Sequence, residues 1–343
     1  MTRITIPNSV TGIGEHAFQV CKNLTNVTLP DSITEIPAFA FWLCDNLSHI
    51  TIPDSVTTIG TMAFANCKKL ARITIPDSVT TIGNCAFSDC TGLSRVTLSE
   101  GITGIGARAF QNCKNLTSLT IPDTVTSIGE RAFDNCTNLT SLHLPDHPID
   151  LGNGAFCGCR SLADKDGFTI VQNTLYHYSG ADGAVRIPDG VTKIDGAFYD
   201  CRSITDITFP DRLTAIGNES FIRCSNLTTL TIPDGVTSIG SEAFFFCENL
   251  TRITIPHSVT SMGKSAFKGC KNLTGITIPD GVTRIEAETF KLCENLNCVI
   301  LSDRITHIAP DAFEGCAYVT IYAPAGSVAE QFAKQNNLSF VAE

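Results

Sequence analysis

Cysteine has the most chemistry to offer in this chain, because its thiolate can bind metals, attack electrophiles or form disulfides. The 343 residues include 16 cysteines. Thirteen of them recur every 23 residues, apart from one gap of 42: Cys21, Cys44, Cys67, Cys90, Cys113, Cys136, Cys159, Cys201, Cys224, Cys247, Cys270, Cys293 and Cys316. Zinc sites need ligand pairs at short spacing, and no CxxC occurs. The fixed period therefore favours a structural repeat over a metal site.

Two states of the repeat thiols are open. Each could pack as a small buried hydrophobic side chain, or neighbouring thiols could pair as disulfides. Free thiols are favoured, because side chains stacked in parallel point the same way and no rule selects one partner over another. Cys298, outside this series at repeat position 3, is expected to face the concave surface and to react readily with alkylating reagents.

No catalytic motif accompanies the cysteines. The chain lacks G-x-S-x-G, G-x-x-x-x-G-K-[ST] and H-E-x-x-H. His143 and His147 are four residues apart but straddle an expected strand and its turn, so they do not share a helix face. Aspartates that recur after proline, such as Asp54 and Asp77, could bind calcium as a stacked column, but turn residues are the favoured interpretation. We expect neither an enzyme nor a bound cofactor or metal.

Composition excludes other classes of function. The net charge of -10 argues against a nucleic-acid-binding protein, because affinity for phosphates depends on clustered Lys and Arg. No stretch approaches the roughly 18 consecutive apolar residues that span a bilayer, and the first residues lack a secretory leader. We expect no membrane insertion in this segment.

The repeat itself predicts the elements that position these residues. Its pattern is L-x-x-I-T-I-P-D-x-V-T-x-I-G-x-x-A-F-x-x-C-x-N, and repeat positions equal residue numbers in the first unit. Ile4 to Ile6 alternates like a short half-buried strand, which Pro7 ends. Ile13 and Gly14 are interpreted as a second bend. The segment from Ala17 to Cys21 is interpreted as a helical turn on the outer side.

Stacking of such units is expected to give one continuous parallel sheet about 60 Å long. The pattern resembles the BspA-like leucine-rich repeats, and thirteen copies in phase cover essentially the whole chain. The resemblance implies an α/β repeat: a right-handed leucine-rich-repeat solenoid of 13 units of 23 residues, with the strands lining its concave face.

We expect four segments: repeats over 1–161, an inserted β-hairpin over 162–184, repeats over 185–318 and a C-terminal cap over 319–343. The hairpin is expected from alternation around Val171 to Thr174. In the cap, Ser327 and Glu330 form a capping box before a short helix, roughly residues 328–336. Because Met1 begins directly on a repeat, the chain is expected to be part of a longer protein.

Surface positions provide the candidate binding residues. On the concave face, repeat position 3 varies and includes Arg72 and Arg95. At position 19, usually polar, three successive units carry Tyr199, Ile222 and Phe245, with Phe246 beside them; the hairpin adds Tyr176 and Tyr178. Exposed aromatic columns tend to mark contacts. The alternative is that the outer turn packs this column against the core.

A solenoid without catalytic residues predicts a non-enzymatic protein-binding module. The resemblance implies a bacterial cell-surface or secreted protein with a role in cell adhesion, whose partners are host matrix or plasma proteins such as fibronectin and fibrinogen. The alternatives are an architectural spacer and an intracellular scaffold.

Overall fold

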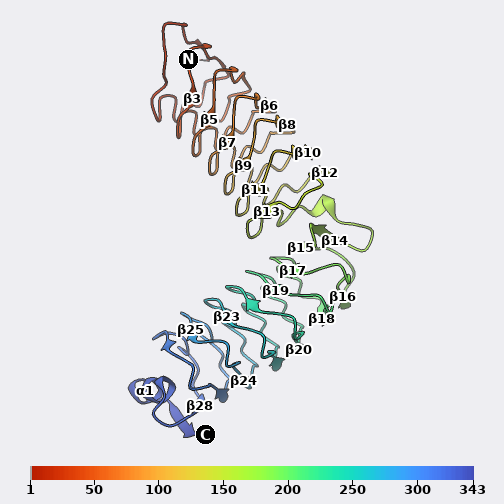
Figure 1. Ribbon diagram of the computed structural model, residues 1–343, viewed down its shortest axis with the longest axis vertical. Helices are drawn as coiled ribbons and strands as arrows, with labels where there is room; N and C mark the ends of the chain where they lie inside the picture. The colour runs from red at the N-terminus through yellow and green to blue at the C-terminus, as the bar shows by residue number, and fades with distance from the viewer. Residues whose placement is uncertain (1) are drawn as a thin grey trace. The chain divides into compact units, whose positions relative to one another are not determined.

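The chain forms two compact stacks of turns in a computed structural model that describes residues 2–343. One unit extends to Lys165 and the other spans Asp166–Glu343. Within each unit, successive turns follow one another like rungs (Figure 1). Strand partners in neighbouring turns are 23 residues apart in the regular part of the array, for example Arg72 and Arg95, which matches the sequence repeat.

The first unit has two strands in most turns. Those near repeat positions 3 to 5 are β1 (Arg3–Thr5), β2 (Asn26–Thr28), β4 (His49–Ile50), β6 (Arg72–Thr74), β8 (Arg95–Thr97), β10 (Ser118–Thr120) and β12 (Ser141–His143). Those at positions 12 and 13 are β3 (Glu35–Ile36), β5 (Thr58–Ile59), β7 (Thr81–Ile82), β9 (Gly104–Ile105), β11 (Ser127–Ile128) and β13 (Asp150–Leu151). A 3₁₀ turn at Arg160–Leu162 follows.

The second unit repeats this plan between a hairpin and a helix. The hairpin is β14 (Phe168–Val171) and β15 (Thr174–Tyr178). The first series continues as β16 (Gly183–Arg186), β18 (Ile204–Thr208), β20 (Thr229–Thr231), β22 (Arg252–Thr254), β24 (Gly275–Thr277), β26 (Cys298–Ile300) and β28 (Thr320–Ala323). The second series is β17 (Lys193–Ile194), β19 (Ala215–Ile216), β21 (Ser238–Ile239), β23 (Ser261–Met262), β25 (Arg284–Ile285) and β27 (His307–Ile308). Helix α1 (Val328–Gln335) and β29 (Ser339–Ala342) follow.

The expectation of one parallel sheet is wrong, because each turn contributes to a second ladder at positions 12 and 13. In the first unit β3, β5, β7, β9, β11 and β13 form this second parallel sheet, on the other side of the turns from β6 to β12 (Figure 1). Glycine at position 14 serves the close approach of turns. A Cβ at Gly60 would lie 2.6 Å from the backbone nitrogen of Ala38 in the turn before.

The segment at repeat positions 17 to 21, on the outer side, is a hydrogen-bonded turn. The helical turn expected there is absent. Its amides bond alternately: Ala63 and Ala65 donate within their own turn, whereas Met62, Phe64 and Asn66 donate to carbonyls of the next turn at 2.8 to 2.9 Å. The backbone is left-handed at Met62 (φ 54°) and Asn66 (φ 63°), and this directs every second amide toward the neighbouring turn. All these buried backbone groups thereby find partners without a helix.

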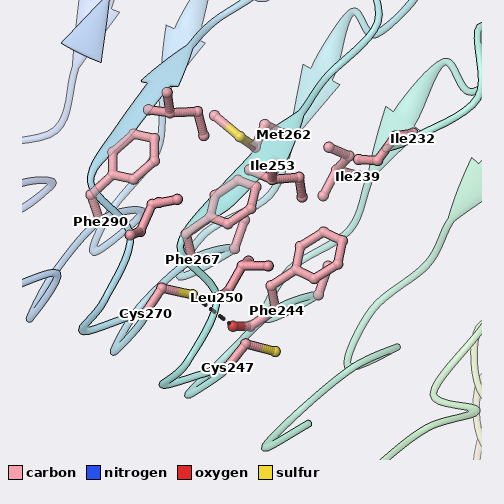
Figure 2. Close-up of a cluster of buried hydrophobic side chains, with 14 of the residues drawn as sticks. Ile232, Ile239, Phe244, Cys247, Leu250, Ile253, Met262, Phe267, Cys270 and Phe290 are labelled. Carbon is pink, nitrogen blue, oxygen red and sulfur yellow. Dashed lines mark hydrogen bonds between the residues drawn. The ribbon is translucent and has the colours of Figure 1, made fainter. Parts of the chain in front are cut away.

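Phenylalanine at position 18 forms the centre of each core. Neighbouring rings stack with centroids 5.1 to 5.3 Å apart in the first unit, close to the spacing of parallel strands. Figure 2 shows Phe244, Phe267 and Phe290 of the second unit in this arrangement, beside aliphatic residues such as Leu250. One turn covers only one side of its ring, so stability depends on the neighbouring turns.

The expected hairpin is present, and it replaces part of a repeat turn. β14 and β15 are antiparallel, while β15 pairs in parallel with β17, as a strand at positions 12 and 13 would. The Tyr178 ring takes the place of the repeat phenylalanine, 5.4 Å from Phe198. Its amide donates to the Ala197 carbonyl, the bond that position 18 makes elsewhere. The hairpin thus covers the first repeat core of the second unit.

The C-terminal helix is present and capped as expected. The Glu330 amide donates to the Ser327 hydroxyl, and the Glu330 carboxylate accepts from the Gly326 amide. Phe332 of α1 places its ring 5.9 Å from that of Phe313, the last ring of the stack. β29 pairs in parallel with β28. The helix and this strand cover the last repeat core.

Candidate protein-binding surfaces

The repeat cysteines are structural residues. From the second turn of each stack onward, Sγ donates to the phenylalanine carbonyl of the turn before, as from Cys270 to Phe244 at 3.2 Å (Figure 2). Burial raises the pKa of Cys247 to about 12. A thiol that is buried, protonated and hydrogen-bonded along the stack is a poor nucleophile and a poor ligand. No disulfide joins cysteines among residues 2–343.

Cys298 lies at the strand face as expected, where strand β28 pairs beside it and leaves it half-buried. Burial, together with the negative charge of Glu343, raises its pKa. The exposed repeat thiol is that of Cys21 in the first turn. Among residues 2–343, no group of three His, Cys, Asp or Glu side chains is arranged to hold a metal ion.

The column at position 19 is only partly exposed. Tyr199 is 55% exposed, whereas Ile222 is 5% exposed and Phe245 is half-buried. Ser88 and Asp134 are also buried at this position, so the outer turn shields it in both units. Of the two alternatives for this column, packing against the core therefore holds for Ile222, and no continuous exposed column forms. Of its three members, Tyr199 alone stands out from the surface.

Tyr176 and Tyr178 are not surface residues. Tyr176 is 1% exposed. Tyr178 lies between the rings of Phe168 and Phe198, and its hydroxyl donates to the Ala181 carbonyl at 2.9 Å. Tyr178 belongs to the hydrophobic core of the second unit, because its hairpin replaces part of a repeat turn. In this structure the two tyrosines offer no binding anchor.

A hollow of about 190 Å³ is lined by Arg202, Arg223, Ser225, Phe246 and Glu248. Arg202 pairs with Asp200, the residue after Tyr199, at 2.8 Å. The Arg223 guanidinium is exposed and makes no ion pair or hydrogen bond within residues 2–343. We call Tyr199, Arg202, Arg223 and Phe246 the outer patch.

Phe245 packs against Phe246 of the outer patch. Its ring meets that of Phe246 edge to face at 4.6 Å, and the Lys268 ammonium lies 5.7 Å from its centroid. Both rings are half-buried. These contacts hold Phe246 in place at the rim of the hollow.

Arg72 and Arg95 lie side by side in register on β6 and β8, and both are exposed as expected. Thr74 and Thr97 extend the same face one step along each strand. We call these four residues the arginine face.

A larger hollow on the strand face of the second unit was not anticipated. It measures about 320 Å³ and lies over β22, β24 and β26, around Gly275. Gly275 stands at position 3 between Arg252 and Cys298, so a side chain is missing from the middle of the row. A glycine at this variable position was the available sequence signal.

No helix among residues 2–343 is long and apolar enough to cross a membrane.

A model of a known protein family matches most of this chain. The model described as "BspA type Leucine rich repeat region (6 copies)" matches residues 1–117, 59–181 and 192–320. None of the curated protein sequences compared with the chain matches it.

Three solved structures match the whole chain. A leucine-rich repeat protein from Bacteroides ovatus is 26% identical, with a TM-score of 0.54 and 84% of its chain covered. A leucine rich cell surface protein from Faecalibacterium prausnitzii is 29% identical, with a TM-score of 0.53 and 83% covered. The pneumococcal vaccine antigen PcpA shares the fold at 20% identity, with a TM-score of 0.54 and 79% covered.

Proposed function

Because this chain belongs to the BspA-type leucine-rich-repeat family, we propose that it is a non-enzymatic protein-binding module of a bacterial cell-surface or secreted protein. Leucine-rich-repeat solenoids typically bind proteins, because stacked turns present long surfaces on a constant core. The related protein from Faecalibacterium prausnitzii, described as a cell surface protein, supports the location. The partners we propose are host matrix or plasma proteins, as an adhesin would bind, and nucleic acid is not among them.

The outer patch is the observation that carries this proposal. Tyr, Trp and Arg dominate the binding energy of protein interfaces, and they act best beside a pocket that excludes water. Tyr199 is 55% exposed, and the next residue, Asp200, pairs with Arg202, which lines the hollow together with Arg223 and Phe246. A tyrosine side chain left this exposed contributes little to folding, so its loss should affect binding and leave the fold unchanged.

The test is Tyr199→Ser in the full chain, with binding to immobilised fibronectin and fibrinogen as the readout. We expect affinity to fall about thirtyfold, as for an interface hot spot, with an unchanged melting temperature. Tyr318→Ser is the matched control, because Tyr318 is 73% exposed in the same unit but far along the stack, at repeat position 23. It should bind like the parent.

Two outcomes would overturn the proposal. Absence of binding to either protein would favour an architectural spacer. Equal loss in the Tyr199 and Tyr318 variants would show that exposed tyrosines act nonspecifically and that the outer patch has no special role.

A further inference from the structure

The arginine face places two like charges next to each other without compensation. Arg72 and Arg95 are direct partners in the register of β6 and β8, so their Cα atoms are about 4.8 Å apart, the usual strand spacing. Both are exposed, and neither guanidinium group makes a hydrogen bond or an ion pair within residues 2–343. Like charges directly opposite on neighbouring strands destabilise a sheet.

The rest of this sheet face offers no carboxylate. The exposed or half-buried residues of the two following strands, β10 and β12, are Ser118, Thr120, Ser141, Leu142 and His143, and none of them is acidic. This is unusual in a chain with 34 acidic and 24 basic residues. Figure 1 shows β6, β8, β10 and β12 in succession along one side of the first unit. The arginine pair therefore lies in a face that is positive or neutral throughout.

We propose that the arginine face binds an extended, acidic segment of the partner protein. Guanidinium groups bind carboxylates in a bidentate manner, and such contacts would relieve the repulsion within the pair. Side chains on one face of an extended peptide are about 6.6 Å apart, a spacing that two long arginine side chains on adjacent strands can match. The Thr74 and Thr97 hydroxyls would supply hydrogen bonds beside them.

The geometry favours a peptide over a highly charged polymer. Nucleic acids and sulfated glycans gain affinity from many cationic contacts along their length. Here two arginines are followed directly by Ser118 of β10. Such a short positive site fits one or two carboxylates. This inference rests on the proposed function, since it names the chemistry of the bound protein segment.

The experiment uses the full chain and a labelled decapeptide of alternating Glu and Ser, followed by fluorescence anisotropy at about 20 mM salt, where screening is weak. The double variant Arg72→Ser with Arg95→Ser should lose about tenfold in affinity, as expected for two exposed charge pairs. A peptide with Gln in place of Glu should not bind.

The matched control is Arg108→Ser with Arg252→Ser, which removes the same charge elsewhere. Arg108 pairs with Glu130 on the outer turn, and Arg252 lies at repeat position 3 of the second unit beside Thr229 and Gly275. The control should bind the peptide like the parent. Equal weakening in both double variants, or unchanged binding in the Arg72 and Arg95 variant, overturns the inference.

Two further results would also overturn it: no binding of the Glu peptide by the parent, or tighter binding of heparin with the same dependence on Arg72 and Arg95, which would assign the face to sulfated glycans. Failure here is distinguishable from failure of the proposed function. The outer patch lies in the other unit, and Tyr199→Ser tests it without touching the arginines.

Discussion

The first turn of the first unit and the last turn of the second unit carry the same kinds of side chain but differ in burial. In the first turn Ile13 and Phe18 are half-buried and Cys21 is exposed. In the last turn Phe313 and Cys316 are each only 5% exposed, because helix α1 packs against the adjoining strands and contributes Phe332. The same repeat position is therefore core or surface according to what stacks on it.

The difference shows that the burial of a side chain in a repeat array depends on the neighbouring turn as well as on its own turn. The half-buried ring of the first turn stacks against one neighbouring ring, whereas a fully buried ring stacks against two. The hairpin and the helix of the second unit act as substitutes, since Tyr178 and Phe332 each stand beside a terminal phenylalanine of that stack.

The largest expected effect is on stability. Phe244→Ala should lower the free energy of unfolding of the second unit by about 3 to 5 kcal/mol, because Phe244 is fully buried between two rings. Phe18→Ala should cost the first unit only about 1 kcal/mol, since the Phe18 ring is only half-buried. Urea unfolding followed by hydrogen exchange in each unit would measure both. Similar losses of unfolding free energy in the two variants would contradict the dependence of burial on neighbouring turns.

Alkylation at about pH 8 would compare the two ends chemically. Burial raises the pKa of Cys316 from 9.0 to about 11, which lowers its thiolate fraction about a hundredfold. Cys316 also donates to the Phe290 carbonyl at 3.0 Å. We expect iodoacetamide to label Cys21 more than a hundredfold faster than Cys316, with Cys298 between them, as read by peptide mass spectrometry. Labelling of Cys316 before Cys21 would reverse the comparison.

The smallest expected effect distinguishes the outer sides of the two ends. Near the first turn, His16 stacks on Phe39 at 4.7 Å. Near the last, Glu288 bonds Lys268 at 2.9 Å and Lys291 at 3.1 Å, and these ammonium groups lower its pKa from 4.5 to about 2. The ionised carboxylate thus stabilises the fold fully above pH 4.5, and this stabilisation is lost as pH falls toward 2.

Glu288→Gln should therefore lower the melting temperature by about 2 °C at pH 7, and the gap to the parent should close as pH approaches 2. Glu15→Gln in the first turn is the control, since Glu15 makes no ion pair within residues 2–343. Its effect should be negligible at every pH. A gap for Glu288→Gln that persists at pH 2 would mean that the network does not act through charge.

The sequence predicted the elements whose signal recurs in every unit. The period of Cys21 and Phe18 predicted stacked turns, and the alternation around Ile4 predicted the first series of strands. The second series could not be predicted from a pattern of alternation, because each of its strands has only two residues. Glycine at position 14 resembled a bend, whereas its role, leaving room for the backbone of the turn before, depends on a residue 22 positions earlier.

Binding surfaces were harder to predict, because a repeat position does not determine how deeply its side chain is buried. Arg72 and Arg95 were expected to be exposed, and alternation in a strand is enough to determine that. Ile222 and Tyr199 share a repeat position, yet one is buried and the other exposed. Their depths depend on the neighbouring outer turns, which no single unit encodes.

The alternating amides of the outer turn also bear on how such genes change in length. Met62, Phe64 and Asn66 each donate to a residue 22 positions ahead, in the next turn. Recombination between copies that adds or removes a whole 23-residue period leaves every donor facing an equivalent acceptor. A shift by one residue would instead misalign every bond across that junction. Selection on this backbone ladder therefore tolerates duplication of complete periods far better than small insertions, so arrays of this kind can lengthen by whole turns.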